Sequence, residues 1–336
     1  MREPEVSVVV VNWNGAAWLP RCLEALRRQR GIQFETVLVD NGSTDGSVEL
    51  VAASFPEVRI VRLPSNEGFA GGNNAGVRAA RARLVAFLNN DTEADPGWLR
   101  ALADALCATP HAALAASRIV FMDRPGVIDS AGDGWLRAGS GFKRGHGSAA
   151  GAWEDQDQVF GACGAACMIR RDAFEAVGGF DEEFFLLFED VDLSYRVRLA
   201  GWTCVYVPAA RVLHASSATI GRLSSLSVFY GQRNVEWVYF GNTPRTLLWR
   251  TLPGHVLYVL AAAVYFAWRR RLAVFLRAKW AALRGVAVIV RKRRAAGALG
   301  GDAAALSSAT TRGWSRIKWA EKRPERRASA PPPSPS

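Results

Sequence analysis

Apolar runs alternate with polar turns over the first 110 residues of the chain. Residues 6–11 are valines interrupted by one serine, which is typical of a strand buried on both faces. Similar runs predict strands at 34–39, 58–63 and 84–88, and helical spacing follows each strand, at 18–29, around Val48 and Val51, at 71–81 and at 98–106. Four strand–turn–helix units in succession predict an α/β domain with a mostly parallel sheet.

One polar residue stands at or just after the end of each predicted strand: Asn12, Asp40, Asn66 and Asp91. The carboxyl ends of parallel strands meet at one edge of a sheet, where α/β proteins bind their ligands. An alternative is that turns are simply rich in asparagine and aspartate, and Asp91 with Thr92 could equally cap a helix. Four such residues at one edge favour a ligand site.

The pattern changes after residue 119. Residues 119–160 are rich in Gly, Asp and Trp and lack a helical period, which predicts hairpins and loops laid over the crevice edge. Residues 159–170 again resemble a strand, and short strands at 203–207 and 211–213 lead to His214.

The densest group of carboxylates is Glu189, Asp190 and Asp192, at the start of a predicted helix. A helix N-terminus favours the ionised form of a carboxylate, which suits a general base. Ordinary N-terminal capping is the alternative, but the apolar run at 184–188 would hold these carboxylates at a dry crevice wall. His214 is either a structural histidine or a metal ligand.

Two common phosphate-binding motifs are missing from the sequence. The first strand–helix turn reads Asn12-Trp13-Asn14-Gly15, without the glycine pattern of dinucleotide-binding folds, and the chain has no P-loop motif. Asp91 stands beside Asn89 and Asn90, and oxygen ligands of this kind suit Mg²⁺ or Mn²⁺ bridging a diphosphate. The carboxylate of Asp40 can accept hydrogen bonds from a nucleobase or a ribose.

Six motifs in order resemble the inverting family 2 glycosyltransferases of the GT-A fold, especially the bacterial rhamnosyltransferase-like branch. They are VSVVVVNWNG (6–15), VDNGSTDGS (39–47), NEGFAGGNN (66–74), FLNNDT (87–92), GGFDEEFFLLFEDVDLSYRVRLAGW (178–202) and VLH (212–214). The resemblance implies a Rossmann-like, mostly parallel sheet flanked by helices.

The resemblance also implies roles for individual residues. The nucleotide-sugar pocket would be lined by Asn12, Asn14, Asp40, Asn66, Gly68, Asn73, Asn74 and Asn90, with Asp40 against the base. Asp91 and His214 would ligate Mg²⁺ or Mn²⁺, and Asn89 stands where many relatives carry the first aspartate of a D-x-D motif. Asp190, in the Glu189–Asp190 pair, would be the catalytic base.

The implied reaction is transfer of a sugar, plausibly rhamnose or a related hexose, from a dTDP- or UDP-sugar to a lipid-linked or polysaccharide acceptor in cell-envelope glycan synthesis. Residues 232–237 do not match the Q-x-x-R-W motif of processive synthases, so a single transfer with inversion is expected. A non-catalytic sugar-nucleotide-binding protein is the alternative, which the intact Glu189–Asp190 pair disfavours.

Charge divides the chain of 336 residues into two parts. The formal charge is +11, yet residues 1–214 hold 21 Lys/Arg against 27 Asp/Glu, whereas residues 215–336 hold 21 against 4. The second part contains the uncharged stretch 251–268 and arginines at 270, 277, 284 and 291. These arginines recur every seven residues, so on one helix they would form a single, slowly drifting stripe. Amphipathic helices lying in an anionic membrane surface are predicted, with a spanning helix or a solvated basic helix as alternatives.

A nucleic-acid partner is not expected, because no recognition motif accompanies the basic run at 291–294. The number of cysteines, five, is odd, which predicts reduced thiols and not a disulfide framework. Together with the basic helices, reduced thiols predict that the enzyme lies at the cytoplasmic side of the cell membrane. Three regions follow: a GT-A domain at 1–220, a helical membrane-associated extension at 221–295, and a basic, partly disordered tail at 296–336. A homo-oligomer is possible.

Overall fold

The computed structural model describes residues 3–216, 224–301, 303–315 and 317–318. Its strands are β1 (Val6–Asn12), β2 (Phe34–Asp40), β3 (Arg59–Arg62), β4 (Leu84–Asn89), β5 (Thr92–Ala94), β6 (Ala112–Phe121), β7 (Ile128–Ala131), β8 (Asp133–Leu136), β9 (Ser140–Lys143), β10 (Asp157–Val159), β11 (Ala166–Arg170) and β12 (Thr203–His214). Its α-helices are α1 (Leu19–Arg27), α2 (Ser47–Ser54), α3 (Gly68–Ala79), α4 (Trp98–Ala108), α5 (Arg171–Ala176), α6 (Glu189–Leu199), α7 (Ser225–Asn242), α8 (Arg245–Trp268), α9 (Leu272–Arg284), α10 (Val286–Ala298) and α11 (Ala303–Ala309), with 3₁₀ turns η1 (Ala150–Ala152) and η2 (Glu182–Phe184).

A ten-stranded sheet forms the centre of the fold, in the order β10-β12-β6-β11-β4-β1-β2-β3, with β5 beside β12 and β7 beside β6. Strands β4, β1, β2 and β3 pair in parallel, as do β6 and β12. β11 runs antiparallel to both β4 and β6 and joins the two parallel groups. The predicted α/β fold with a mostly parallel sheet, flanked by helices, is confirmed.

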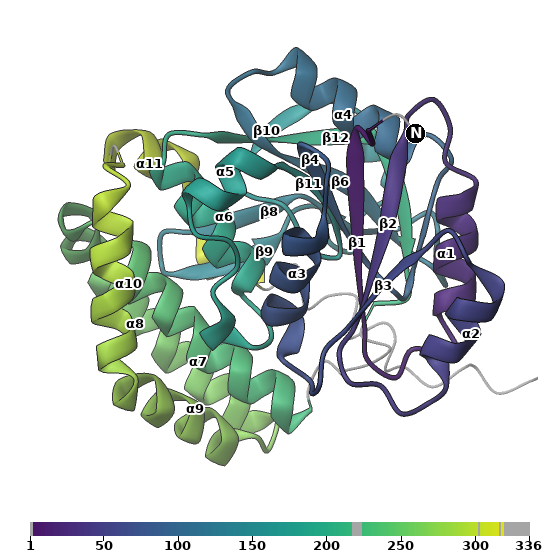
Figure 1. The fold of residues 1–336 in the computed structure, drawn as a ribbon. Coiled ribbons are helices and arrows are strands. Elements are labelled where there is room, and N and C mark those ends of the chain that lie inside the picture. The colour runs from purple at the N-terminus through teal and green to yellow at the C-terminus, as the bar shows by residue number, and fades with distance from the viewer. Residues whose placement is uncertain (1–2, 217–223, 302, 316, 319–336) are drawn as a thin grey trace, which may run out of the picture.

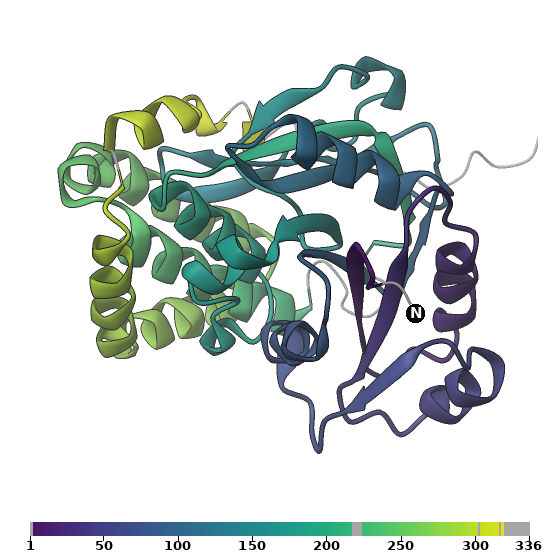
Figure 2. The ribbon, with the colours of Figure 1, turned by 45° about the horizontal axis from the view of Figure 1, so that its top comes forward.

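Alternate side chains of β1 enter two different cores, which explains its unbroken apolar run. Val8 and Val10 pack in a core with α1 and α4, whereas Val9 packs in a core with α3 and α6. Helices therefore cover both faces of the sheet, as Figures 1 and 2 show. A strand buried on both faces has no position for a polar side chain without a partner.

Several predicted elements differ in the structure. Within residues 159–170 only Ala166–Arg170 forms a strand of its own, β11, while Val159 ends β10. The two short strands predicted before His214 are one strand with an irregularity between Val207 and Arg211. Thr92 begins strand β5, so the helix-cap alternative for Asp91 and Thr92 is wrong. The next helix, α4, begins at Trp98.

Helices α7–α10 gather at the end of the molecule remote from α1 and α2 (Figure 1). They share a core with η2 and α6, because Val235 and Val238 of α7 cluster with Phe184, Val191 and Tyr195. The extension is thus packed on α6 through apolar side chains. The boundaries at 220 and 295 stay predictions, and the residues after 318 lie outside the part of the chain described.

The arginines that recur every seven residues do not share one helix. Arg270 lies between α8 and α9 with a φ of +55°, Arg277 and Arg284 lie on α9, and Arg291 lies on α10. The helical path breaks at Arg270 and again at Gly285, so the predicted single stripe is wrong. All four side chains remain exposed.

Candidate active site

The ends of β4, β1 and β2 meet at one edge of the sheet, as predicted. Asn12 is in register with Asp40 on β2, and its neighbour Val11 is in register with Asn89 on β4. The Asn12 side chain is fully buried, donates to the hydroxyls of Ser43 and Ser47 at 3.1 and 2.9 Å, and accepts from Asn90 at 2.9 Å. Asn12 therefore joins the turns after all three strands into one rigid edge.

The turn after β2 is held by short-range polar contacts. Asp40 Oδ1 accepts from the Ser43 amide at 3.2 Å, and Asn14 Oδ1 accepts from the Thr44 amide at 2.8 Å. Asn14 remains exposed, with a φ of +52°. These contacts fix the turn and leave Asn14 accessible to a ligand.

Asn41 connects this turn to the loop before α3. Its buried side chain donates to Asn66 Oδ1 and to the Gly68 carbonyl, both at 3.0 Å, and accepts from the Glu67 amide at 2.9 Å. Gly68 has a φ of +73°, and a Cβ there would lie 2.3 Å from the carbonyl oxygen of Phe185. Only glycine fits at this position.

Asn73 and Asn74 of α3 form their hydrogen bonds with residues other than the candidates at the sheet edge. Asn73 donates to the Phe69 carbonyl of its own helix at 2.9 Å. Asn74 donates to the Phe180 carbonyl at 2.8 Å and accepts from the Phe180 amide at 3.0 Å, so it fastens the turn before η2. Their assignment to the nucleotide-sugar pocket stays a prediction.

Asp91 and His214 lie together across the β5–β12 pair. His214 Nε2 is 3.4 Å from Asp91 Oδ1, and both residues are buried. Two adjacent ligands of an octahedral Mg²⁺ or Mn²⁺ ion, at bonds of about 2.1 Å, lie about 3 Å apart. A carboxylate oxygen and an imidazole nitrogen at this separation fit a divalent cation whose other positions are taken by phosphate oxygens and water.

Asp129 of β7 fixes His214 from its other side. Its carboxylate lies 2.8 Å from His214 Nδ1 and is bonded by Lys143 at 3.0 and 3.1 Å. A carboxylate on the far nitrogen is the usual support of a metal-binding histidine. Burial alone would raise the pKa of Asp129, but Lys143, His146 and His214 hold it well below the usual range.

A second carboxylate group surrounds Asp190 at the start of α6. Carboxylate oxygens of Asp190 and Asp133 and the thiol of Cys163 lie within 4.8 Å of one another. The two oxygens of Asp190 accept from the amides of Gly164 at 2.9 Å and Val191 at 2.8 Å. Asp190 is also partly exposed, as a group that reacts with a bound substrate must be.

Burial has the opposite effect from the one predicted for the helix N-terminus. It raises the pKa of Asp190, against the lowering effect of the two amides and of Lys143. Burial, with the charge of Asp190, also raises the pKa of Glu189 well above the usual range. Glu189 Oε2 has no hydrogen-bond partner within the part of the chain that the structure describes. Burial therefore favours the neutral form of Glu189 beside the partly exposed Asp190.

The raised pKa of Asp133 leads us to expect that the stability of the folded chain depends on pH. Burial and the nearby Asp190 raise its pKa to about 8, against about 3.9 in an unfolded chain. Between these values the folded chain holds one more proton than the unfolded chain, so stability falls as the pH rises. Asparagine mimics the neutral acid, and we expect the melting temperature of Asp133→Asn to rise relative to wild type from pH 5 to pH 8.

Thermal unfolding at several pH values checks this expectation. Asp155→Asn is the matched control, because Asp155 is exposed, and its profile should run parallel to that of wild type. A difference between Asp133→Asn and wild type that stays constant with pH would show that Asp133 does not hold the extra proton.

Four residues at this site were not singled out from the sequence: Asn41, Asp129, Asp133 and Lys143. The last three lie in the segment at 119–160, whose lack of periodicity gave no register for any one side chain. Asn41 stands directly after Asp40 in VDNGSTDGS, and its place at a strand end was the signal that could have identified it.

Comparisons with known proteins agree with this geometry. The sequence profile described as Glycosyl transferase family 2 matches residues 7–178, which ends before Asp190 and His214. The N-acetylglucosaminyl-diphospho-decaprenol L-rhamnosyltransferase of Mycobacterium tuberculosis is 32% identical over 238 residues, covering 64% of this chain and 77% of that enzyme.

Solved structures share the fold at low sequence identity. GalNAc-T7 with UDP, GalNAc and Mn²⁺ has a TM-score of 0.56 at 18% identity, over 71% of this chain and 50% of that one. The mannosyltransferase PcManGT of Pyrobaculum calidifontis with GDP-Man and Mn²⁺ has a TM-score of 0.51 at 18% identity, over 89% and 88%. The fold is that of the GT-A glycosyltransferases, and with the profile match and the rhamnosyltransferase relative it follows that this chain is a glycosyltransferase of family 2.

Proposed function

We propose that the chain is a metal-dependent, inverting glycosyltransferase of cell-envelope glycan synthesis. It would move a single sugar, rhamnose or a related hexose, from a dTDP- or UDP-sugar to a hydroxyl of a lipid-linked or polysaccharide acceptor. The similarity to a rhamnosyltransferase that acts on a decaprenol-linked acceptor supports this choice. The observation that carries it is the pairing of Asp91–His214 with the partly exposed Asp190 in one connected site.

Lys143 connects the two halves of the site. It bonds Asp129, which supports His214, and its positive charge also acts on Asp133 and Asp190. Its charge thus stabilises the ionised form of Asp190 against burial. A base that is poised in this way can accept a proton near neutral pH.

The residues then divide the reaction between them. Asp40, Asn14 and Asn66 at the sheet edge would hold the nucleotide and the sugar, with the buried Asn12 fixing the turns beneath them. Asp190 would remove the proton from the acceptor hydroxyl. The acceptor oxygen would attack the anomeric carbon from the face opposite the nucleotide, so that configuration inverts without a covalent intermediate. A divalent cation held by Asp91 and His214 would neutralise charge on the departing diphosphate.

A donor panel tests the proposal. The purified protein is incubated with dTDP-rhamnose, UDP-glucose, UDP-galactose or GDP-mannose, with Mg²⁺ or Mn²⁺ and a polyprenyl-diphosphate-linked N-acetylglucosamine acceptor. We expect transfer from one dTDP- or UDP-sugar, and nuclear magnetic resonance of the product should show the anomeric configuration opposite to that of the donor. A product with retained configuration would overturn the inverting mechanism.

We infer that the enzyme works at the cytoplasmic side of the membrane through the outer surfaces of α8, α9 and α10. Exposed apolar side chains recur there, from Leu257 onward at steps of three or four residues: Trp249, Leu257, Leu260, Val264, Trp268, Leu272, Leu276, Trp280, Leu283, Val286 and Val290. Exposed arginines 270, 277, 284 and 291 stand among them. This α8–α10 surface suits the boundary between acyl chains and anionic headgroups.

The inner face of α8 favours a position in the membrane plane. The helix is long and apolar enough to cross a membrane. His255 in its middle is nevertheless buried, 2.9 Å from Glu236 Oε2 and 2.8 Å from the Ala138 carbonyl. A spanning α8 would have to abandon these contacts and leave Glu236 buried without His255, which is costly.

Vesicle binding tests this surface. We expect the protein to co-sediment with phosphatidylglycerol-containing vesicles and much less with phosphatidylcholine alone. Leu276→Glu should weaken binding by about tenfold or more. It removes an exposed apolar side chain whose burial in the bilayer is worth about 2 kcal/mol, and it adds a negative charge that anionic headgroups repel. Ala53→Glu on the exposed face of α2 is the matched control. Equal binding by the two variants would exclude the α8–α10 surface as the membrane-binding site. Salt-sensitive binding to nucleic acid, with no binding to vesicles, would show that the basic helices bind nucleic acid instead.

A further inference from the structure

The loop that carries Asp190 has an unusual backbone. The loop 184–188 runs from Phe184, the last residue of η2, to the start of α6. Three of its residues, Phe185, Leu187 and Phe188, have φ values of +61°, +66° and +72°. Side chains other than glycine rarely adopt this conformation, and bulky ones least of all. Such a loop keeps its shape only where surrounding groups hold it.

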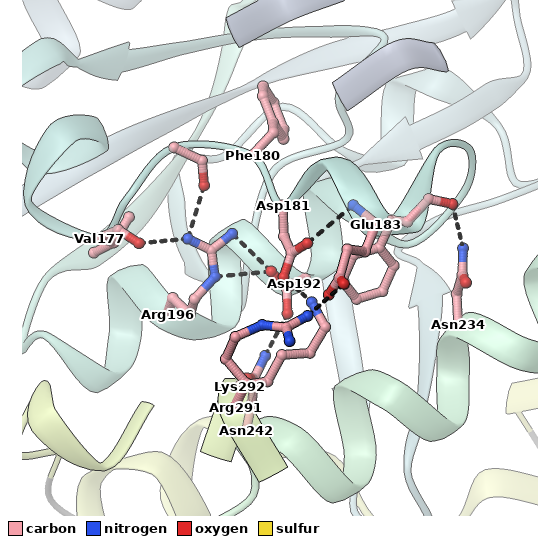
Figure 3. Close-up of polar contacts among 12 residues, drawn as sticks. Val177, Phe180, Asp181, Glu183, Asp192, Arg196, Asn234, Asn242, Arg291 and Lys292 are labelled. Carbon is pink, nitrogen blue, oxygen red and sulfur yellow. Dashed lines mark hydrogen bonds and ion pairs between the residues drawn. The ribbon is translucent and has the colours of Figure 1, made fainter. Parts of the chain in front are cut away.

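Asn234 of α7 supplies that support. Its side chain is fully buried, and its Nδ2 atom donates to three carbonyls of the loop, those of Phe184 at 3.1 Å, Leu186 at 2.9 Å and Leu187 at 2.7 Å. Figure 3 shows Asn234 pointing from α7 at this segment. One side-chain amide thus binds three carbonyls that the positive-φ backbone points toward α7, and it holds the loop in this shape.

Arg233, the preceding residue, sets the direction of that amide. Its Nε donates to Asn234 Oδ1 at 2.8 Å, which leaves Nδ2 facing the loop. Its Nη2 donates to the carbonyls of Glu183 at 2.9 Å and Phe184 at 3.1 Å. The guanidinium lies 4.1 Å from the ring centre of Trp237 and is held there by the cation–π contact.

The residues before the loop are also tied to the helical extension. Lys292 and Arg291 of α10 form ion pairs with Asp181 and Glu183. On the other side of the loop, Asn242 of α7 donates to Asp192 of α6 at 2.8 Å. Figure 3 shows these contacts around the segment that Asn234 holds.

Both ends of the loop reach the proposed site. Phe188 directly precedes Glu189 and Asp190, and the Phe185 carbonyl accepts from the Phe69 amide at 2.9 Å, next to Gly68. A change in the loop would therefore move the base and disturb the start of α3. These positions need to be held closely, since a misplacement of about 1 Å can cost about 100-fold in rate.

We propose that Arg233 and Asn234 are positioning residues, which hold the 184–188 loop so that Asp190 stays in its reactive place. The catalytic role of Asp190 rests on the proposed function, whereas the hold on the loop does not. It follows that α7, although it lies in the basic C-terminal third, is part of the active site.

Asn234→Asp tests the proposal with little change in shape. The carboxylate can still accept from Arg233, but it cannot donate to the three carbonyls and is repelled by them. Hydrogen–deuterium exchange of the full-length protein should show peptides covering 183–190 exchanging at least tenfold faster. In the folded chain the amides of Phe184, Phe185 and Leu186 donate to the carbonyls of Asp181, Glu182 and Phe184, and these hydrogen bonds depend on the shape of the loop. With dTDP-rhamnose, or whichever donor the panel identifies, kcat should fall about 100-fold while the KM for the donor changes less than threefold.

Val228→Ala is the matched control. Val228 is equally buried on α7 but packs against Phe266 and Phe275, away from the loop. It should lower the melting temperature without changing exchange at 183–190 or kcat. If Asn234→Asp unfolds, Arg233→Lys replaces it, since lysine keeps the charge and loses the two-armed contact.

The outcomes separate this inference from the proposed function. Unchanged exchange at 183–190 in both variants, or a kcat loss no greater than that of Val228→Ala, would overturn the positioning role. If the wild-type protein transferred no sugar but the variants still exchanged faster at 183–190, the proposed reaction would be refuted. The inference that Arg233 and Asn234 hold the loop would stand.

Discussion

Asp190→Asn should lower kcat by about 10²–10⁴-fold, the usual contribution of a general base. Asparagine has nearly the same shape and retains an oxygen that can accept from the amide of Gly164 or Val191, so the local backbone should stay in place. It cannot take up a proton. Steady-state kinetics with saturating donor should therefore show the loss in kcat, with the KM for the donor changed less than threefold.

Two further variants make the Asp190 result specific. Glu175→Gln alters an exposed carboxylate that pairs with Arg171 on α5, and it should transfer sugar at the wild-type rate. Glu189→Gln replaces a buried carboxyl whose raised pKa favours the neutral form, and the loss of kcat should be much smaller than that of Asp190→Asn. Wild-type turnover by Asp190→Asn, or a larger loss in Glu189→Gln, would assign the base elsewhere.

The sheet and its helices could be predicted because their signals are local. Residues 6–11 and 84–88 are apolar without a break, and each is a strand with neighbours on both sides and helices on both faces. The predicted lengths were wrong for elements whose ends depend on the strands or helices packed beside them. Residues 203–214 form one strand because β6 and β5 pair along it, and the arginine stripe breaks because α8–α10 fold back over α7.

Apart from Glu189 and Asp190, which stand out as a dense carboxylate cluster at a helix start, site residues could be predicted only where they end or follow a strand. Asn12, Asp40 and Asp91 were expected at one edge because parallel strands end together. Asp129 and Asp133 come from a segment without period, and no local signal brings them to His214 or Asp190. Burial likewise reversed the direction predicted for Glu189 and Asp190, because a helix N-terminus is visible in a sequence and the packing around it is not.

The proposed cation site at Asp91 and His214 can be tested by substitution and by metal removal. Asp91→Asn should lower kcat/KM by about 10³-fold. A metal ion would stabilise the transition state by several kcal/mol, because it neutralises charge on the departing diphosphate, and Asp91 is the carboxylate beside His214. Removing divalent ions from wild type with EDTA should cause a loss of the same order, restored by Mn²⁺. Calorimetry of dTDP and UDP binding should show that Mn²⁺ tightens binding to wild type and has little effect on the variant.

Asp95→Asn is the matched control for Asp91→Asn. Asp95 lies four residues further along the same segment, and its carboxylate pairs with Arg211 of β12 at 3.3 Å. Its removal should leave the effect of Mn²⁺ on nucleotide binding intact, because Arg211 and not a cation neutralises it. If Asp91→Asn kept the Mn²⁺ effect while His214→Gln lost it, the cation would be held by His214 with other partners. If both kept it, the assignment of the metal to the β5–β12 pair would fail, and the buried carboxylates around Asp190 would become the place to look for it.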